Sequence, residues 1–417
     1  MLKIRKVIVG ISGGVDSAVA AIMLKNKDFN IHGIFMQNWD IADETGVCKS
    51  DEDFRDASII CDKLAIPLAR VNFVKQYWNE VFSDLLKEYE SGNTPNPDVM
   101  CNRYVKFDAF FHYAREYHNA DAIATGHYAR SSFGSYLQFY DPSKKARLLK
   151  AVDHKKDQTL FLCQIKQEAL RRTMFPLGEH IKTDVKRLAI ENGLIQIAKK
   201  KESMGICFIG LRHFPNFISE YLHNKPGNFI NIDNGKIVGQ HNGIHQWTLG
   251  QRTKLTGLPI AYFTAKKNIN TNDIYVAKGT EHPSLYTESL YTSPPHWIHS
   301  CPVELENGGI FKCEFKFQHV ENFVTCQMCL VEAGVVVILE SPRRAVTPGQ
   351  YAVFYRNEEC LGSAKILHAG PSYYTLNLFK NTNKSRIYKD KLFKLEKSVE
   401  ADNFELPTSS MSVKISC

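Results

Sequence analysis

The stretch Lys6–Ser17 reads KVIVGISGGVDS, and it decides the fold of the N-terminal half of this chain. Its first half, Lys6–Ile11, is a short apolar run rich in β-branched residues, which is typical of a buried parallel strand. A glycine-rich turn follows, and the alanine-rich run Ser17–Lys27 after it predicts a helix. A strand that leads through such a turn into a helix presents backbone N–H groups and the positive end of the helix dipole to an anion.

The residue types of the turn Ser12-Gly13-Gly14-Val15-Asp16-Ser17 suit a phosphate ligand. Adjacent glycines let the backbone approach a phosphate closely, and the two serine hydroxyls can donate hydrogen bonds. Asp16 would repel phosphate unless a cation mediates, so we expect it to have a role linked to Mg²⁺. The turn is neither a Walker A loop, which needs Gly-Lys-Ser/Thr, nor the dinucleotide motif G-x-G-x-x-G. The alternative is a plain strand–helix turn without a ligand.

Strands and helices are expected to alternate in the first half of the chain. Further strands are predicted at Ile31–Met36, Leu68–Phe73 and Ala122–Thr125, and helices at Asp51–Leu64, Lys75–Ser91 and Asn102–His118. This order predicts an α/β, Rossmann-like domain with a parallel sheet covered on both faces. Met36 and Gly126 fall at the carboxyl ends of strands, where open α/β sheets bind ligands.

The pattern changes after about Gly210. Phe229–Gly239 has the alternation of a hairpin with Asn234-Gly235 as its turn. Beyond Asn272 the expected strands are short and separated by turns, which predicts an all-β barrel or sandwich. We therefore expect a catalytic domain over 1–210, a small mixed α+β domain over 211–275, a β-barrel over 276–380 and a disordered tail over 381–417.

The bulk composition restricts the partners and the compartment. The formal net charge of +8 over 417 residues suits a protein that meets a polyanion, although many basic proteins bind no nucleic acid. Eleven scattered cysteines are too sparse for a disulfide scaffold and favour a reducing compartment. No apolar run approaches the roughly 18 residues of a membrane span, so no membrane partner is expected.

Two cysteines stand out by their neighbours. Cys101 ends the proline-stiffened loop Thr94–Met100 at the start of an expected helix, where the dipole lowers the pKa of a thiol. Asp98, three residues earlier, is close enough for proton transfer near the same substrate atom. Cys207 follows the basic run Lys199–Lys201, whose positive field favours the reactive thiolate. The alternatives are that Asp98 only caps the helix and that both cysteines only fill space.

These blocks together resemble the tRNA-specific 2-thiouridylase (tRNA-uridine 2-sulfurtransferase) family, which uses an ATP-pyrophosphatase loop. The resemblance spans about residues 5–370 and includes Phe35–Trp39, Thr94–Asn102, Phe175–Gly178, Gly205–Gly210 and Thr347–Gln350. Arg171-Arg172-Thr173 and Glu202–Gly205 look most like the animal mitochondrial members. The resemblance therefore implies a mitochondrial matrix protein, which the basic, apolar start Met1–Lys6 suits weakly.

The resemblance implies a role for each matching residue. ATP is expected to contact Gly10, Ile11, Ser12, Gly13, Gly14, Val15, Asp16, Ser17, Met36 and Gly126. Cys207 is expected to carry a persulfide, Cys101 to act as the partner nucleophile that forms a disulfide with it, and Asp98 to act in acid–base steps. The target base and tRNA are expected to contact Asn96, Pro97, Asp98, His127, Lys156, Asp157, Gln158, Gln318, His319 and Gln350. Gln318 departs from the family's pattern, because it lacks the positive charge that the family often has at this position.

The implied reaction replaces the 2-oxygen of a wobble uridine by sulfur. ATP, with Mg²⁺, adenylates that oxygen and makes AMP the leaving group, with pyrophosphate released. The implied partners are tRNAs, expected to be the lysine, glutamate and glutamine acceptors, and a persulfide donor from a cysteine desulfurase pathway. Two other hypotheses remain: a pyrophosphatase-type synthetase that forms a C–N bond and needs neither cysteine, and a non-catalytic tRNA-binding descendant.

Overall fold

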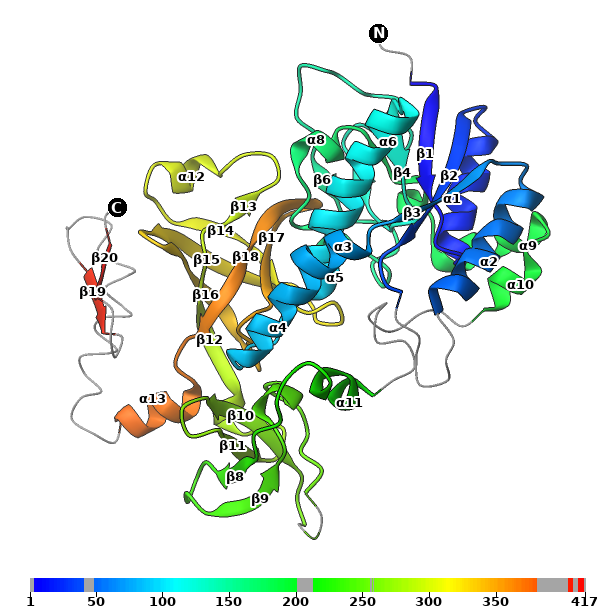
Figure 1. The fold of residues 1–417 in the computed structure, drawn as a ribbon. Helices are drawn as coiled ribbons and strands as arrows, with labels where there is room; N and C mark the ends of the chain where they lie inside the picture. The colour runs from blue at the N-terminus through cyan, green and yellow to red at the C-terminus, as the bar shows by residue number, and fades with distance from the viewer. Residues whose placement is uncertain are drawn as a thin grey trace.

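A computed structural model describes residues 4–40, 49–200, 213–255, 257, 259–380, 404–407 and 412–415 of the chain. Figure 1 shows an α/β domain on one side, a six-stranded barrel beside it and a small sheet below the two. Within this described part, no helix is long and apolar enough to cross a membrane. The expected architecture, an α/β domain followed by a mixed domain and a β-barrel, is confirmed.

The N-terminal domain is built on a five-stranded parallel sheet. Its strands are β1 (Lys6–Gly10), β2 (Asn30–Gln37), β3 (Leu68–Asn72), β4 (Ala122–Ala124) and β7 (Thr173–Met174), in the order β3-β2-β1-β4-β7. The consecutive residues Val7, Ile8 and Val9 are all fully buried. Since neighbouring strand residues point to opposite faces, both faces of the sheet are covered. The helices around it include α1 (Val15–Lys25), α2 (Lys49–Lys63), α9 (Lys182–Glu191) and α10 (Ile195–Lys199).

Two longer helical runs connect the strands to the rest of the molecule. The first comprises α3 (Val74–Tyr77), the π-helix η1 (Trp78–Phe82) and α4 (Ser83–Glu90), and the second comprises α5 (Pro97–Met100), the π-helix η2 (Cys101–Ala109) and α6 (Phe110–His118). The second run was expected to begin at Asn102. It begins five residues earlier, because Asn96 caps it by accepting a hydrogen bond from the Val99 N–H. Proline at the first helical position needs no N–H partner, which also favours this start.

The middle domain is small. It contains α11 (Phe214–Ser219), the short 3₁₀ helix η4 (Ile244–Gln246) and a four-stranded sheet in the order β10-β11-β8-β9: β10 (Tyr262–Asn268), β11 (Asp273–Lys278), β8 (Gly227–Asn231) and β9 (Ile237–His241). The predicted hairpin is β8–β9, and Gly235 in its turn has φ +69°. That left-handed conformation is one that glycine adopts without steric cost.

Six antiparallel strands close the C-terminal barrel. They are β12 (Tyr286–Thr292), β14 (Phe311–Lys316), β15 (Val324–Val331), β16 (Gly334–Arg344), β17 (Tyr351–Arg356) and β18 (Glu359–Ala369). The order β12-β16-β15-β14-β17-β18 returns to β12 through the β12–β18 pairing. Cys326 and Cys329 both lie on β15, as the strand interpretation of their C-x-x-C spacing expects. Shorter elements are η5 (Pro283–Leu285), β13 (His296–Trp297), α12 (Val303–Glu306) and α13 (Tyr373–Lys380).

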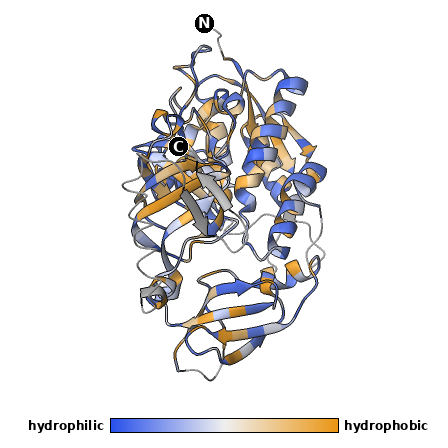
Figure 2. Cartoon of the chain, turned by 90° about the vertical axis from the view of Figure 1, so that its left-hand side faces the viewer, coloured by the Kyte–Doolittle hydropathy of each residue, from blue (hydrophilic) through white to orange (hydrophobic). Residues whose placement is uncertain are grey.

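The N-terminal domain contributes two strands to the sheet of the barrel. β5 (Arg130–Ser131) pairs with β6 (Leu148–Leu149), and β6 pairs with β18 of the barrel. α7 (Thr159–Leu162), α8 (Gln167–Leu170) and η3 (Pro176–Glu179) complete this region. The large apolar core accordingly runs from the parallel sheet to Val353, Tyr355 and Cys360 of the barrel. In Figure 2 many strands in the upper part of the molecule are hydrophobic, whereas the outer helices and the strands of the lower sheet alternate between the two colours.

Within the segment 381–417, for which a disordered tail is expected, the structure describes two short strands. β19 (Phe404–Pro407) and β20 (Ser412–Ile415) pair in antiparallel fashion. The rest of that segment lies outside the described residues.

Candidate active site

The glycine-rich turn between β1 and α1 is held closed by Ser17. Its hydroxyl accepts a hydrogen bond from the Ser12 N–H at 3.1 Å and donates one to the Gly14 carbonyl at 3.0 Å. Gly13 has φ +77°, and a Cβ there would lie 2.4 Å from the carbonyl oxygen of Asp53. The cap residue Gly14 has no side chain to accept from the first N–H groups of α1, which suits this helix end for an anion.

Met36 and Gly126 lie beside this turn, at the carboxyl edge of the parallel sheet. A Cβ on Gly10 would lie 3.2 Å from the Met36 methyl group. Gly126 follows β4, and a Cβ there would lie 2.6 Å from backbone atoms of Asp16 and Ser17. Only glycine permits this approach, so the fold brings together three of the chain segments that were expected to contact ATP.

Asp16 is paired with a lysine that the sequence did not single out. The ammonium group of Lys182, the first residue of α9, lies 2.7 and 2.8 Å from the two carboxylate oxygens of Asp16. The hydroxyl of Tyr128 donates to one of them at 3.0 Å. Held in this way, Asp16 does not fit a direct ligand of Mg²⁺, and no other described cluster of His, Cys, Asp or Glu suits a metal. The magnesium role remains a prediction from the sequence.

Cys101 lies one turn inside the helical run, with its side chain buried. Its N–H already bonds to the carbonyls of Pro97 and Asp98. Because the effect of the helix dipole falls off within the first turn, that dipole acts on Cys101 less than the sequence suggested. The cap of the helix is Asn96, so the capping alternative for Asp98 is wrong.

Asp98 lies in the first turn of α5, three residues before Cys101. The residue as a whole is exposed, but burial of its carboxyl group raises its pKa, and the positive charge of Lys106 opposes this shift. An upward shift of a carboxyl pKa is the direction that suits a group in acid–base catalysis. The structure thus places an acid of this kind one turn from the candidate nucleophile.

Residues of the barrel hydrogen-bond to the loop that leads to Asp98. The Gln350 amide donates to the carbonyls of Thr94 (2.8 Å) and Pro95 (3.1 Å), and its oxygen accepts from the Asn96 side chain at 3.2 Å. The Thr94 N–H donates to the Pro348 carbonyl at 2.9 Å. The Gln350 and Asn96 side chains, both expected to meet tRNA, therefore meet each other and fix the position of this loop.

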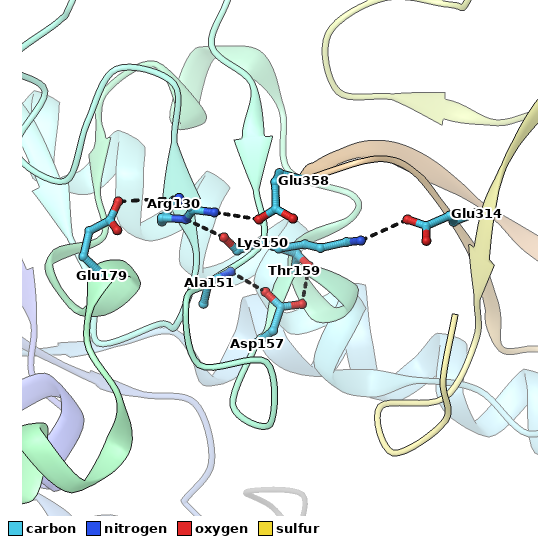
Figure 3. Close-up of polar contacts among 8 residues, drawn as sticks. All are labelled: Arg130, Lys150, Ala151, Asp157, Thr159, Glu179, Glu314 and Glu358. Carbon is cyan, nitrogen blue, oxygen red and sulfur yellow. Dashed lines mark hydrogen bonds and ion pairs between the residues drawn. The ribbon is translucent and has the colours of Figure 1, made fainter. Parts of the chain in front are cut away.

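The three residues Lys156, Asp157 and Gln158 do not share one environment. Asp157 is buried and accepts hydrogen bonds from the Ala151 N–H (2.9 Å) and the Thr159 hydroxyl (2.6 Å), as Figure 3 shows. Burial raises the pKa of Asp157, and these hydrogen bonds oppose the shift. The Asp157 side chain is therefore an internal support of the loop, whereas Lys156 is only partly buried.

Two of the other residues expected to contact tRNA also have contacts within the protein. His319 donates from Nε2 to the Asp157 carbonyl at 2.9 Å and stacks on Phe161, so the 318–319 turn of the barrel lies against the 156–158 loop. The His127 ring lies 2.8 Å from the Thr125 hydroxyl. Burial, with a smaller contribution from Lys106, lowers the pKa of His127 well below its usual range, which leaves the ring neutral at physiological pH.

Ion pairs join the N-terminal domain to the barrel close to the same loop (Figure 3). Arg130 contacts Glu358 at 2.8 Å, and its Nε donates to the Lys150 carbonyl at 2.6 Å. The buried Lys150 contacts Glu314 at 3.0 Å and lies 3.8 Å from the centre of the Phe323 ring. Both pairs thus link a cation of the N-terminal domain to a carboxylate of the barrel that stays partly exposed.

Cys207 belongs to the segment 201–212, which lies outside the described residues. The described residue before this segment, Lys200, pairs with Asp53 at 3.0 Å and with Asp56, next to Gly13 of the glycine-rich turn. On the other side, Phe217 of α11 packs in an aromatic cluster with Trp39 and Phe82. Both neighbouring segments are thus fixed on the N-terminal domain.

Three family models match the chain in succession. Residues 5–211 match the "tRNA methyl transferase HUP domain", residues 215–278 the "tRNA methyl transferase PRC-barrel domain", and residues 287–366 the "Aminomethyltransferase beta-barrel domain".

Curated relatives match almost end to end. "Mitochondrial tRNA-specific 2-thiouridylase 1" of Drosophila melanogaster is 50% identical over 370 residues, which cover 88% of this chain and 95% of that protein. The protein of the same name from Homo sapiens is 47% identical and covers 90% and 93% of the two chains. "tRNA-specific 2-thiouridylase MnmA" of Lactiplantibacillus plantarum is 43% identical and covers 87% and 95%.

Proposed function

Because the chain belongs to the tRNA-specific 2-thiouridylase family, we propose that it thiolates the wobble uridine of tRNA anticodons at C2 in an ATP-dependent reaction. One observation carries the proposal. The helical run 97–118 bears Asp98 and Cys101 at its beginning, and its Phe107 packs on His127, next to Gly126 of the expected ATP site. The candidate nucleophile and the candidate nucleotide site are therefore positioned by the same helix.

The proposed reaction has two chemical stages. First, the C2 oxygen of uridine attacks the α-phosphorus of ATP, and the bond to the β-phosphate breaks with release of pyrophosphate. The backbone N–H groups at the start of α1 would hold the phosphates during this step. The uridine O2 then bears AMP, a far better leaving group than oxide.

Sulfur transfer follows at C2. The terminal sulfur of a Cys207 persulfide attacks C2, and AMP departs with the former O2. The Cys101 thiolate then attacks the Cys207 sulfur, which forms the Cys101–Cys207 disulfide and leaves 2-thiouridine. Asp98 supplies or accepts the protons of these steps, and the upward shift of its pKa supports this role. A separate reductant must restore both thiols before the next turnover.

The partners that we propose follow from the same family membership. The tRNA substrates are the acceptors for lysine, glutamate and glutamine, and the sulfur comes from a persulfide donor of a cysteine desulfurase pathway. The name of the Drosophila relative supports a mitochondrial location. A flipped base in a single-stranded anticodon loop is the substrate geometry that such a site can reach.

The test uses the purified full chain, ATP, a persulfide donor and tRNA from cells that lack the protein. Nucleoside mass spectrometry should detect 2-thiouridine with the wild type and none with Cys207→Ser or Cys101→Ser, while both variants still bind tRNA. Cys301→Ser, which changes a half-buried cysteine packed against the core of the barrel, is the matched control and should retain activity. Thiolation by the Cys207→Ser variant would refute the cysteine mechanism.

A further inference from the structure

The loop 153–158 is connected to Asp16 of the glycine-rich turn by two separate chains of contacts. This loop contains Lys155 and Lys156, and Asp16 lies in the first turn of α1. The loop and Asp16 are far apart in the sequence. The residue that contacts Asp16 is Lys182 in the first connection and Tyr128 in the second.

The first connection runs through Asp153 and Lys182. One carboxylate oxygen of Asp153 accepts from the Lys155 N–H at 3.1 Å, and the other accepts from the Lys182 N–H at 2.9 Å. Asp153 thus ties the backbone of the loop to the first residue of α9. The Lys182 ammonium group then contacts both oxygens of Asp16, with 11% of the lysine side chain exposed. A partly buried pair of this kind is stronger than an exposed one.

The second connection runs through Gln158 and Tyr128. The Gln158 side-chain oxygen accepts from the Tyr128 N–H at 2.9 Å, and the Gln158 N–H donates to the Tyr128 carbonyl at the same distance. Tyr128 is buried, and its hydroxyl donates to Asp16 at 3.0 Å. Two backbone contacts on one buried residue hold its ring in place, so a displacement of Gln158 reaches the hydroxyl that contacts Asp16.

We propose that Lys182 and Tyr128 are positioning residues that couple the binding of RNA at the loop 153–158 to the binding of ATP at the glycine-rich turn. The inference rests on the proposed function, which makes this loop a tRNA contact. RNA that holds the loop also holds Asp153 and Gln158, and through them both partners of Asp16. Since Asp16 lies in the turn of N–H groups that would receive the phosphates, fixing it favours ATP. Coupling between sites is reciprocal, so ATP equally tightens tRNA binding.

The test measures the dissociation constant of α,β-methylene-ATP, which cannot release pyrophosphate, with and without saturating tRNA. The full-length wild type is expected to bind the analogue at least about fivefold more tightly with tRNA, the lower end of usual coupling between sites. Tyr128→Phe combined with Asp153→Asn cuts both connections and keeps side-chain size. For this double variant, the ratio of the dissociation constants of the analogue without and with tRNA should lie within about twofold of one. Each single variant should give a ratio between this value and that of the wild type.

Matched controls separate coupling from general loosening. Tyr136→Phe changes a tyrosine of the same domain that stacks on Phe29, and Asp141→Asn changes an aspartate that accepts from the N–H two residues later, as Asp153 does. Both should keep the wild-type ratio. A wild-type ratio near one, or a double variant with the wild-type ratio, would overturn the proposal. Binding of tRNA and ATP without thiolation would overturn the proposed function alone, and no tRNA binding would overturn both.

Discussion

Replacing Lys182 by methionine should weaken ATP binding by leaving the charge of Asp16 uncompensated. Methionine keeps most of the length of the lysine stem, so the packing around α9 is largely retained. The Asp16 carboxylate would then keep the Tyr128 hydrogen bond but lose its only described cationic partner, while it remains in the turn that is expected to hold phosphates. An unpaired carboxylate at this position repels a triphosphate.

The geometry of the pair sets the magnitude. Side-chain exposure is 11% for Lys182 and 35% for Asp16, so the pair lies between a surface and a buried ion pair. Two unit charges about 4 Å apart interact by about 1 kcal/mol in bulk water and about 4 kcal/mol near a protein surface, and these values bound the repulsion between the unpaired carboxylate and a phosphate. An intermediate cost of about 2 kcal/mol corresponds to a dissociation constant for ATP that is about 30-fold higher.

The assay is equilibrium binding of α,β-methylene-ATP without tRNA, with thermal melting as the check on folding. The double variant Asp16→Asn with Lys182→Met removes the unpaired charge, and it should bind within about threefold of the wild type. Arg187→Met removes an exposed cation of the same helix and should have no effect. Wild-type affinity in Lys182→Met, or a double variant as weak as Lys182→Met, would refute this reasoning.

Three further results are expected. Gly13→Ala should abolish ATP binding, because the left-handed φ and the carbonyl oxygen of Asp53 leave no room for a Cβ. A binding titration with ATP that gives the wild-type affinity would contradict this. Gln350→Ala should lower the thiolation rate at least about tenfold with little change in ATP affinity, because it releases the Thr94 loop; the single-turnover rate constant and the dissociation constant of ATP, measured separately, distinguish the two effects. Burial lowers the pKa of the Lys267 ammonium group to about 7 from 10.5. The unfolded chain therefore binds more protons between these values, and stability should rise with pH from about 7 upward; melting temperatures should lose this rise in Lys267→Met.

Local patterns predicted the parts of the fold that depend on neighbouring residues. The apolar run before the glycine-rich turn became β1, and the alternation of strands and helices became a parallel sheet with buried faces. Asn234-Gly235 became the turn of the β8–β9 hairpin. The helix begins at Pro97 rather than at the expected Asn102, and the signals for this start are also local, since Asn96 is the cap and a proline follows at the first helical position.

No local sequence pattern predicted the contacts between residues that are far apart in the chain. The β6–β18 pairing involves strands of two residues, too short for any periodicity to reveal. Asp157 is expected from the sequence to contact tRNA, but its side chain is buried, and the barrel residue His319 that contacts its carbonyl comes from far along the chain. The partner of Asp16 lies 166 residues away and the partner of Asn96 254 residues away, so no spacing rule connects them.

The sequence by itself determined the strand–turn–helix that suits a phosphate, the order of the three domains and the identity of the candidate nucleophiles. These depend on backbone preference, hydrophobic period and side-chain chemistry, all of which act within a few residues. Only the tertiary structure decided which charges are paired and which polar residues are buried. Burial and pairing are set by the segments that the fold packs around a group, and here they bring Lys182 to Asp16 from 166 residues away.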